Sequence, residues 1–293
     1  MIPIVDTHQH LWDLQQFHLP WLDGGGPLAH NHTPTDYRRE IEGLTVVKTV
    51  YMEVDVEASQ KAAEAEYVLG LCADPNNPMA GAVIGGNPAA DGFAAYVARF
   101  QSNPSLKGVR QVLHGGLPAK TCLQPEFVRG VRLLGEAGLR FDLCLRSTDL
   151  LDGAQLAEWC PDTRFILDHC GNADPKAADQ SQWERDIAAV AEQQNVVCKI
   201  SGIVASTQPN AWTADELAPI IRHCAAVFGP DRIMFGSDWP VCTLTATYRQ
   251  WVEALQTIVA GWSEADQYKL FHDNAVRFYE LQSVTTLGIE KVL

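Results

Sequence analysis

Basic residues are scarce in this chain and are not clustered. Its 293 residues include 22 Lys and Arg against 36 Asp and Glu, which gives a formal net charge of −14 at pH 7. A phosphate backbone or an anionic lipid surface requires clustered cationic side chains. The composition therefore argues against nucleic-acid and membrane partners.

The eight cysteines include no C-x-x-C pair. Most stand in apolar stretches, such as Cys144 and Cys198, which is typical of small buried side chains in a reducing compartment rather than of a disulfide framework. No apolar run approaches the length of a membrane span, and the N-terminus lacks the regions of a secretory leader. We therefore expect a cytoplasmic protein.

No Gly-x-Gly-x-x-Gly turn follows any expected strand, which disfavours an open doubly wound sheet. Short β-rich apolar runs alternate instead with amphipathic segments, and eight such runs predict a single-domain (β/α)8 TIM barrel over residues 1–293. The expected strands are Ile2–Asp6, Val46–Glu53, Ala80–Gly85, Leu106–Leu113, Leu139–Leu145, Arg164–Asp168, Val196–Ser201 and Arg232–Ser237. The expected helices cover 58–72, 91–102, 124–137, 149–160, 181–194 and 213–228, the last opened by a capping box at Thr213.

Two segments depart from this alternation. Residues 11–33, which include Trp12 and Trp21, are expected to form a loop over the face where the strands end and active sites lie. Residues 262–281 are expected to form a final helix with Ser263 as its N-cap. The tail, 282–293, is expected to pack outside the barrel or against a second subunit, so a homo-oligomer stays open.

Two histidines follow the first apolar run, at positions i and i+2. On a strand these positions face the same side, so the imidazoles of His8 and His10 are expected to lie side by side. Near the other end of the chain, an expected strand stops at a second polar residue, Asp238. A closed barrel would bring these two ends together.

Polar residues at the C-terminal ends of barrel strands converge on one pocket. Each has a simple structural explanation when taken alone, but burying so many without partners would be costly. The candidates are His8, His10, Glu53, Asn87, Arg110, His114, Asp142, Arg146, His169, Lys199, Ser201 and Asp238.

The sharpest subset is His8, His10, His169 and Asp238. Three imidazoles and a carboxylate are suited to bind Zn²⁺ or a similar divalent cation. The same groups could instead hold a carboxylate or lactone oxygen by hydrogen bonds while Asp238 activates water. The residues alone leave both possibilities open.

Five ordered motifs resemble those of the amidohydrolase superfamily, and within it the branch of TIM-barrel hydrolases that open sugar-acid and pyrone-dicarboxylate lactones. They are Val5-Asp-Thr-His-Gln-His10, Gly108-Val-Arg110, Leu167-Asp-His-Cys-Gly171, Lys199-Ile-Ser-Gly202 and Phe235-Gly-Ser-Asp-Trp-Pro-Val241. The resemblance spans nearly the whole chain. It implies that Asp238 is the general base for the attacking water. It also implies that the three histidines bind a metal or polarise the carbonyl, and that Arg110 binds substrate.

Two departures from the binuclear members of that superfamily limit the metal content. Asp142 and Cys144 stand in the expected fifth strand where those members have a histidine, and Arg110 replaces their bridging lysine. We therefore expect at most one divalent metal, with Zn²⁺ as first choice, or none. Its expected ligands are His8, His10 and Glu53, with Asp238 or His169 as further ligands.

The resulting expectation is hydrolysis of a sugar-acid lactone of the fucono, rhamnono or galactono kind, in carbohydrate catabolism. The expected catalytic residues are Asp238 and His169, and the expected substrate-binding residues are Arg110, His114, Asp142, Lys199 and Trp12. One alternative is metal-dependent decarboxylation of an aromatic or muconate-type acid, which similar relatives perform with related motifs. Another is a non-catalytic barrel that binds sugar acids.

Overall fold

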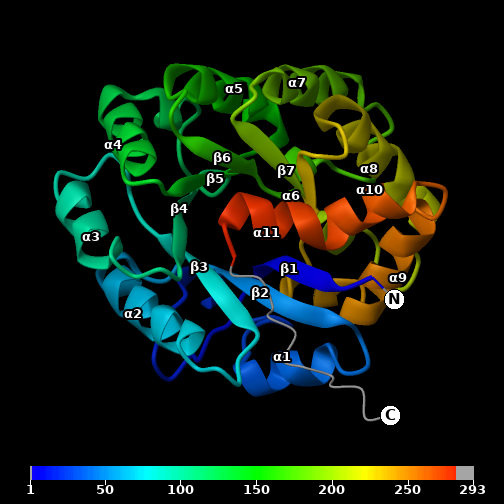
Figure 1. The fold of residues 1–293 in the computed structure, drawn as a ribbon, viewed down its shortest axis with the longest axis horizontal. Coiled ribbons are helices and arrows are strands. Elements are labelled where there is room, and N and C mark those ends of the chain that lie inside the picture. Colours follow the sequence, from blue (N-terminus) through cyan, green and yellow to red (C-terminus); the bar gives the residue numbers. More distant parts are fainter. Residues whose placement is uncertain (1, 282–293) are drawn as a thin grey trace, which may run out of the picture.

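The computed structural model describes residues 2–281 and forms a single-domain (β/α)8 barrel, as expected (Figure 1). Within these residues eight parallel strands pair in sequence order, from β1 next to β2 through to β7 next to β8. The strands are β1 (Ile4–Gln9), β2 (Val46–Met52), β3 (Met79–Gly85), β4 (Leu106–Val112), β5 (Arg140–Cys144), β6 (Arg164–Leu167), β7 (Val196–Ile200) and β8 (Ile233–Phe235).

Helices surround the strands, and the six expected helices are confirmed to within a few residues. Three further helices, α1, the four-residue α6 and α9, are absent from the predicted set. The helical elements are α1 (Pro34–Glu40), α2 (Lys61–Cys72), α3 (Phe93–Phe100), α4 (Pro125–Glu136), α5 (Leu150–Trp159), α6 (His169–Asn172), α7 (Ser181–Glu192), α8 (Ala214–Phe228), α9 (Tyr248–Ile258), α10 (Glu264–Tyr268) and α11 (Asn274–Tyr279).

Side-chain capping occurs at different helices from the one expected. The predicted capping box at Thr213 is wrong: α8 begins there, but the Thr213 side chain makes no capping hydrogen bond. Complete capping boxes begin α1 at Thr33 and α9 at Thr247, where a threonine and the third helical residue exchange hydrogen bonds. Ser263 accepts a hydrogen bond from the Asp266 amide, as expected of the N-cap of the C-terminal helical segment.

The C-terminal helices lie across one end of the barrel, where α10 and α11 cross in front of the strands in Figure 1. A π-helical turn, Lys269–Asp273, joins them. Tyr279 of α11 packs on the apolar residues of the barrel interior, which include Val5, Val50, Val83 and Met234. The opposite end of the barrel is therefore the one open to ligands. The expected tail, 282–293, lies outside the described residues.

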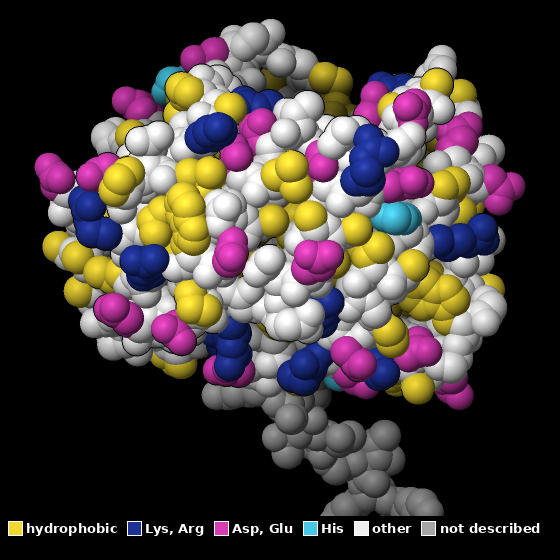
Figure 2. Space-filling view, turned by 90° about the horizontal axis from the view of Figure 1, so that it is seen from above, with side chains coloured by type: hydrophobic (Ala, Val, Ile, Leu, Met, Phe, Trp, Pro, Cys, Tyr) yellow, Lys and Arg dark blue, Asp and Glu magenta, His cyan; other side chains and the backbone are white. Residues whose placement is uncertain are grey.

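The charged surface agrees with the scarcity of basic clusters. Acidic and basic side chains are interspersed over the face that Figure 2 shows. Among the helices of residues 2–281, none combines the length and the apolar character needed to cross a lipid bilayer.

The barrel closes where β1 meets β8, and β1 differs here from its expected bounds. It was expected to stop at Asp6 but continues to Gln9, with a register shift against β2 between Asp6 and Gln9. Polar residues can continue this strand because their side chains find buried partners: the Thr7 hydroxyl donates to the Phe235 carbonyl at 2.6 Å. Beyond β8 the Asp238 amide donates to the His8 carbonyl at 2.8 Å, and the His10 amide donates to the Trp239 carbonyl at 2.8 Å.

The buried carboxylate of Asp6 stabilises this closure between β1 and the chain after β8, on the outer side of the barrel. Asp6 accepts hydrogen bonds from the Ser237 amide at 2.8 Å and the Ser237 hydroxyl at 2.6 Å. It also accepts from the hydroxyls of Tyr37 in α1, at 2.8 Å, and Tyr248 in α9, at 3.1 Å. Asp6 thus joins β1, the chain after β8 and two helices far apart in sequence.

We expect Asp6→Ala to lower the free energy of unfolding by about 2–4 kcal/mol, because the buried donors around Asp6 lose their shared acceptor. Urea denaturation monitored by tryptophan fluorescence measures the change. Asp6→Asn keeps one acceptor oxygen and should lose less, and the exposed Asp91→Ala should lose almost nothing. Equal stability of Asp6→Ala and Asp91→Ala would contradict this role.

Candidate active site

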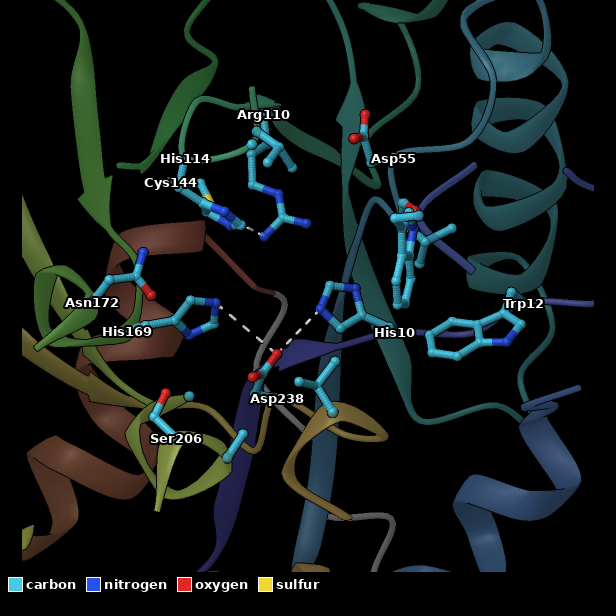
Figure 3. Close-up of a pocket in the computed structure, with 17 residues that line it drawn as sticks. His10, Trp12, Asp55, Arg110, His114, Cys144, His169, Asn172, Ser206 and Asp238 are labelled. Carbon is cyan, nitrogen blue, oxygen red and sulfur yellow. Dashed lines mark hydrogen bonds and ion pairs between the residues drawn. The ribbon is translucent and has the colours of Figure 1, made fainter. Parts of the chain in front are cut away.

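A pocket of about 380 Å³ opens at the C-terminal ends of the strands (Figure 3). Its polar lining includes His10, Arg110, His114, His169 and Asp238. Apolar side chains cover much of the rest: Trp12 and Trp21 from residues 11–33, with Val54, Val112 and Val241. The pocket therefore combines a cluster of ionisable groups with an aromatic wall.

Three imidazoles surround one oxygen of Asp238. The distance from Asp238 Oδ1 is 3.3 Å to His10 Nε2, 3.7 Å to His8 Nε2 and 4.0 Å to His169 Nε2. Figure 3 shows the Asp238 carboxylate between His10 and His169. The centroids of the His8 and His10 rings are 4.9 Å apart, so the i, i+2 spacing does place both imidazoles together.

Hydrogen bonds at the far side of the rings orient two of these histidines. His10 Nδ1 lies 2.9 Å from the Met52 carbonyl oxygen. Since a carbonyl oxygen can only accept, Nδ1 carries a proton, and Nε2 is the ring nitrogen that faces Asp238. His169 Nδ1 lies 2.9 Å from the Ser201 hydroxyl.

The backbone also fixes the direction of His169 and Asp238. Asp238 has a left-handed conformation, with φ of 58°, which turns its carboxylate into the pocket and which Asp tolerates better than most residues. Gly202 has φ of 70°, and a Cβ there would lie 2.3 Å from His169 Nδ1. A glycine at this position is thus what lets His169 reach the pocket.

The donor set and its spacing fit one divalent cation. In a tetrahedral Zn²⁺ site with bonds of about 2.1 Å, neighbouring ligand atoms lie about 3.4 Å apart. The 3.3–4.0 Å separations around Asp238 Oδ1 are close to that value and longer than ordinary hydrogen bonds. His8, His10 and Asp238 form a group that could hold a metal, and His169 lies within reach of it.

Arg110 occupies the position beside this cluster. Its Nε donates to Glu53 Oε1 at 2.7 Å, and its Nη2 donates to the Glu53 carbonyl at 2.7 Å. Its Nη1 lies 3.4 Å from His8 Nε2 and 3.9 Å from Cys144 Sγ. A guanidinium held by Glu53 thus lies next to His8 and Cys144.

Buried charged side chains lie below His8. Its Nδ1 is 3.3 Å from Asp168 Oδ1, which is 3.2 Å from Lys199 Nζ. Lys199 Nζ also lies 2.7 Å from Asp142 Oδ2. Burial alone would raise the pKa of Asp168. The nearby Lys199 and His8 side chains outweigh this effect and hold the pKa of Asp168 well below its usual range. Burial lowers the pKa of His8 well below its ordinary value, so this ring is neutral.

The structure separates the predicted site residues into three groups. His8, His10, His169 and Asp238 come together, and Arg110, His114 and Trp12 line the pocket around them. Asp142 and Lys199 do not line it; they are fully buried and paired with each other, because opposite charges meet inside the barrel. Glu53 is likewise not at the cluster: its Oε1 binds Arg110 and its Oε2 accepts from the Asp55 amide.

Several pocket residues were missing from the predicted set. Asp55, Cys144 and Asn172 line the pocket, and Asp168 contacts His8. Asp168 could have been found, since it immediately precedes His169 at the end of an expected strand. Asp55 lies in a loop and Asn172 ends the short left-handed segment α6, and the sequence carries no such signal at either position.

Comparisons with known proteins identify the family. The amidohydrolase family model matches residues 5–281. An L-fucono-1,5-lactonase of Burkholderia multivorans is 28% identical, over 94% of this chain and 96% of its own. An L-rhamnono-gamma-lactonase of Scheffersomyces stipitis is 25% identical, over 95% and 98%. The crystal structure of a Burkholderia multivorans amidohydrolase with bound zinc has a TM-score of 0.86 at 25% identity, over 96% and 100%.

Fold and site together define a TIM-barrel hydrolase with its active site at the C-terminal ends of the strands. The match across residues 5–281 places it more narrowly: the chain belongs to the amidohydrolase family.

We expect the protein to bind one equivalent of Zn²⁺ and His10→Ala to bind it at least tenfold more weakly. Removing residues that only support metal ligands costs on the order of 10–100-fold in affinity, so removing a ligand should cost no less. Isothermal titration calorimetry on metal-stripped protein measures both affinities. The exposed His18→Ala is the matched control and should bind like the wild type. Equal affinity in His10→Ala would remove this residue from the ligand set.

A second buried carboxylate, Glu64 of α2, lies behind Glu53. Its Oε1 accepts from the Tyr51 hydroxyl at 2.8 Å and the Val54 amide at 2.9 Å, while its Oε2 has no hydrogen-bond partner in the described chain. Burial, together with the negative charge of Glu53, raises the pKa of Glu64 to about 7. Burial therefore favours the protonated form of Glu64 in the folded protein.

Because the folded-state pKa is raised above the unfolded value of about 4.3, Glu64 should destabilise the fold as pH rises through the interval from about 4.3 to 7. The full cost above pH 7 is about 4 kcal/mol. Glu64→Gln cannot ionise and should gain stability relative to the wild type between pH 5 and pH 8, in urea denaturation at each pH. Glu66→Gln, on the exposed side of α2, should run parallel to the wild type. A parallel Glu64→Gln curve would refute the raised pKa.

Proposed function

We propose that this protein hydrolyses sugar-acid lactones, of the fucono, rhamnono or galactono kind, to the open hydroxy acids. The observation that carries the proposal is the Asp238 carboxylate, held in the pocket with three imidazoles around one of its oxygens. The lactonase names of two full-length relatives support the same chemistry.

Asp238 is positioned to act as the general base. Water bound at the Asp238 carboxylate gives a proton to it while the water oxygen adds to the lactone carbonyl carbon. The electron pair of the carbonyl π bond moves to the carbonyl oxygen. When this intermediate collapses, the bond to the ring oxygen breaks, and the ring oxygen takes the proton from Asp238. The product is a hydroxy acid, and Asp238 is again ionised.

Cationic and neutral donors face the developing oxyanion. Burial alone would lower the pKa of Arg110, but the adjacent Glu53 carboxylate raises this pKa above its usual value. Arg110 therefore stays charged. Preorganised donors of this kind stabilise a developing charge without moving. His169 lines the same pocket, and the Ser201 hydroxyl and Gly202 set its direction. We assign His169 to the reacting carbonyl group and Arg110 with His114 to substrate binding.

A divalent cation such as Zn²⁺, held by His8, His10 and Asp238, would supply Lewis acidity at the carbonyl when bound. The protein's own contribution is to orient the donor atoms: His8 is held by Asp168, and the Nδ1–H of His10 is held by the Met52 carbonyl.

The aromatic wall is suited to the carbon face of a sugar ring. Trp12 is buried, and its indole donates to the His30 carbonyl at 2.7 Å. Trp21 is 45% exposed, and its indole donates to the Val54 carbonyl at 2.8 Å. The two rings meet edge to face at 5.5 Å, which keeps the wall rigid.

We expect Asp238→Asn to lower kcat for lactone hydrolysis by on the order of 10²–10⁴-fold, the usual contribution of a general base. Asparagine keeps the size of the side chain and tolerates the positive φ at this position. A pH-indicator assay on a panel of aldono-1,4- and 1,5-lactones measures the change.

The control for this experiment is Asp91→Asn, an exposed carboxylate outside the pocket, which should keep wild-type activity. Wild-type protein that hydrolyses none of the lactones, with or without added Zn²⁺, would refute the proposed function. Unimpaired turnover by Asp238→Asn would refute the mechanism alone. Release of CO₂ from an aromatic acid would instead indicate a decarboxylase.

A further inference from the structure

Three cysteines from three separate elements meet behind the wall of the active site. They are Cys170 in α6, Cys198 in β7 and Cys224 in α8, and all are fully buried. Their sulfur atoms lie within 4.8 Å of one another. The thiols of Cys170 and Cys198 each lie 3.7 Å from the Lys199 carbonyl oxygen, on the side of the strand away from the Lys199 ammonium.

We propose that Cys170, Cys198 and Cys224 form a binding site for a trivalent thiophilic metalloid, of which arsenite is the simplest representative. Thiol donors select soft centres over Mg²⁺ or Ca²⁺, which prefer oxygen. Two features then favour a trivalent centre over a divalent one: the number of donors and the charge.

The number of sulfurs is three, whereas structural Zn²⁺ takes four ligands. Trivalent arsenic completes its valence with three sulfurs. The charge favours the same choice, because three thiolates around a divalent ion leave a net negative charge in a fully buried place, which is costly. Three thiolates around a trivalent centre are neutral.

The reaction is an exchange that needs no oxidant. Arsenite, As(OH)₃, reacts with the three thiols to form three As–S bonds and break three As–O bonds. Each thiol proton leaves in a molecule of water together with one hydroxyl group, so three waters are released. Arsenic stays trivalent, and no sulfur changes its oxidation state.

The backbone gives a route to this buried site. All four residues of α6, from His169 to Asn172, have φ between 52° and 65°. Left-handed conformations cost free energy at residues other than glycine, so this segment should open more readily than the regular helices. Binding at Cys170 would draw the sulfurs together and shift the adjacent His169. We therefore expect binding to be slow and to be felt in the active-site pocket.

Native mass spectrometry after incubation with arsenite tests the proposal. We expect one adduct for each chain, with a mass gain of one arsenic less three protons, and its removal by excess dithiol. X-ray absorption at the arsenic edge should count three sulfurs, and the imidazole NMR signals of His169 should shift. The absorption measurement uses the wild type and does not depend on how the variants fold.

Cys198→Ala and Cys224→Ala should each abolish the three-sulfur adduct. The matched control is Cys122→Ala, which removes another buried cysteine and should leave the adduct intact; circular dichroism checks that all three are folded. An adduct with fewer than three sulfurs would overturn the proposal, as would a three-sulfur adduct that survives in either cluster variant. The absence of any adduct after prolonged incubation would also overturn it.

Discussion

The closure of the barrel between β1 and β8 is the constraint on which the active site depends. The amide of Asp238 on the carbonyl of His8, and the amide of His10 on the carbonyl of Trp239, fix the two ends of the chain in one register. That register brings the Asp238 carboxylate to the two histidines of β1. Asp6, which binds Ser237 and two tyrosines from α1 and α9, fastens the same seam from the helical layer. Stability and function therefore share one set of contacts.

Below the pocket, paired buried charges fill the barrel interior, whereas apolar side chains fill it elsewhere. Arg110 is balanced by Glu53, and Lys199 by Asp142 and Asp168. Each pair is buried, so removing one member would leave an uncompensated charge at a cost of about 3–5 kcal/mol. These buried pairs hold the His8 and Arg110 side chains in fixed orientations at the pocket. This is the preorganisation that stabilisation of an oxyanion requires.

The sequence was sufficient to predict the fold and the cluster of three histidines with Asp238. Strand-helix alternation predicted the barrel, and in a parallel barrel the polar ends of the strands must meet. It was not sufficient to place Glu53, Asp142 and Lys199. Their partners lie on other strands, across the barrel, and no local pattern encodes which charges will meet there. The full length of β1 was also missed, because the hydrogen-bond partners of its polar residues lie in β8 and in the chain that follows β8.

Helices α1 and α9 were missed although both have capping boxes, because their neighbouring loops broke the regular alternation. The cysteines were treated as isolated small apolar residues. Only the left-handed turn at His169–Asn172 brings Cys170 against Cys198 and Cys224, and such a turn cannot be read from composition.

The most direct test of the proposed chemistry is hydrolysis of an aldonolactone by the wild-type protein in ¹⁸O-labelled water, at a rate well above spontaneous opening. Attack of an Asp238-activated water on the carbonyl predicts one label in the carboxylate of the product and none in the hydroxyl group derived from the ring oxygen. Label in that hydroxyl group would mean that the bond between the ring oxygen and the sugar carbon had broken instead, which would contradict the mechanism.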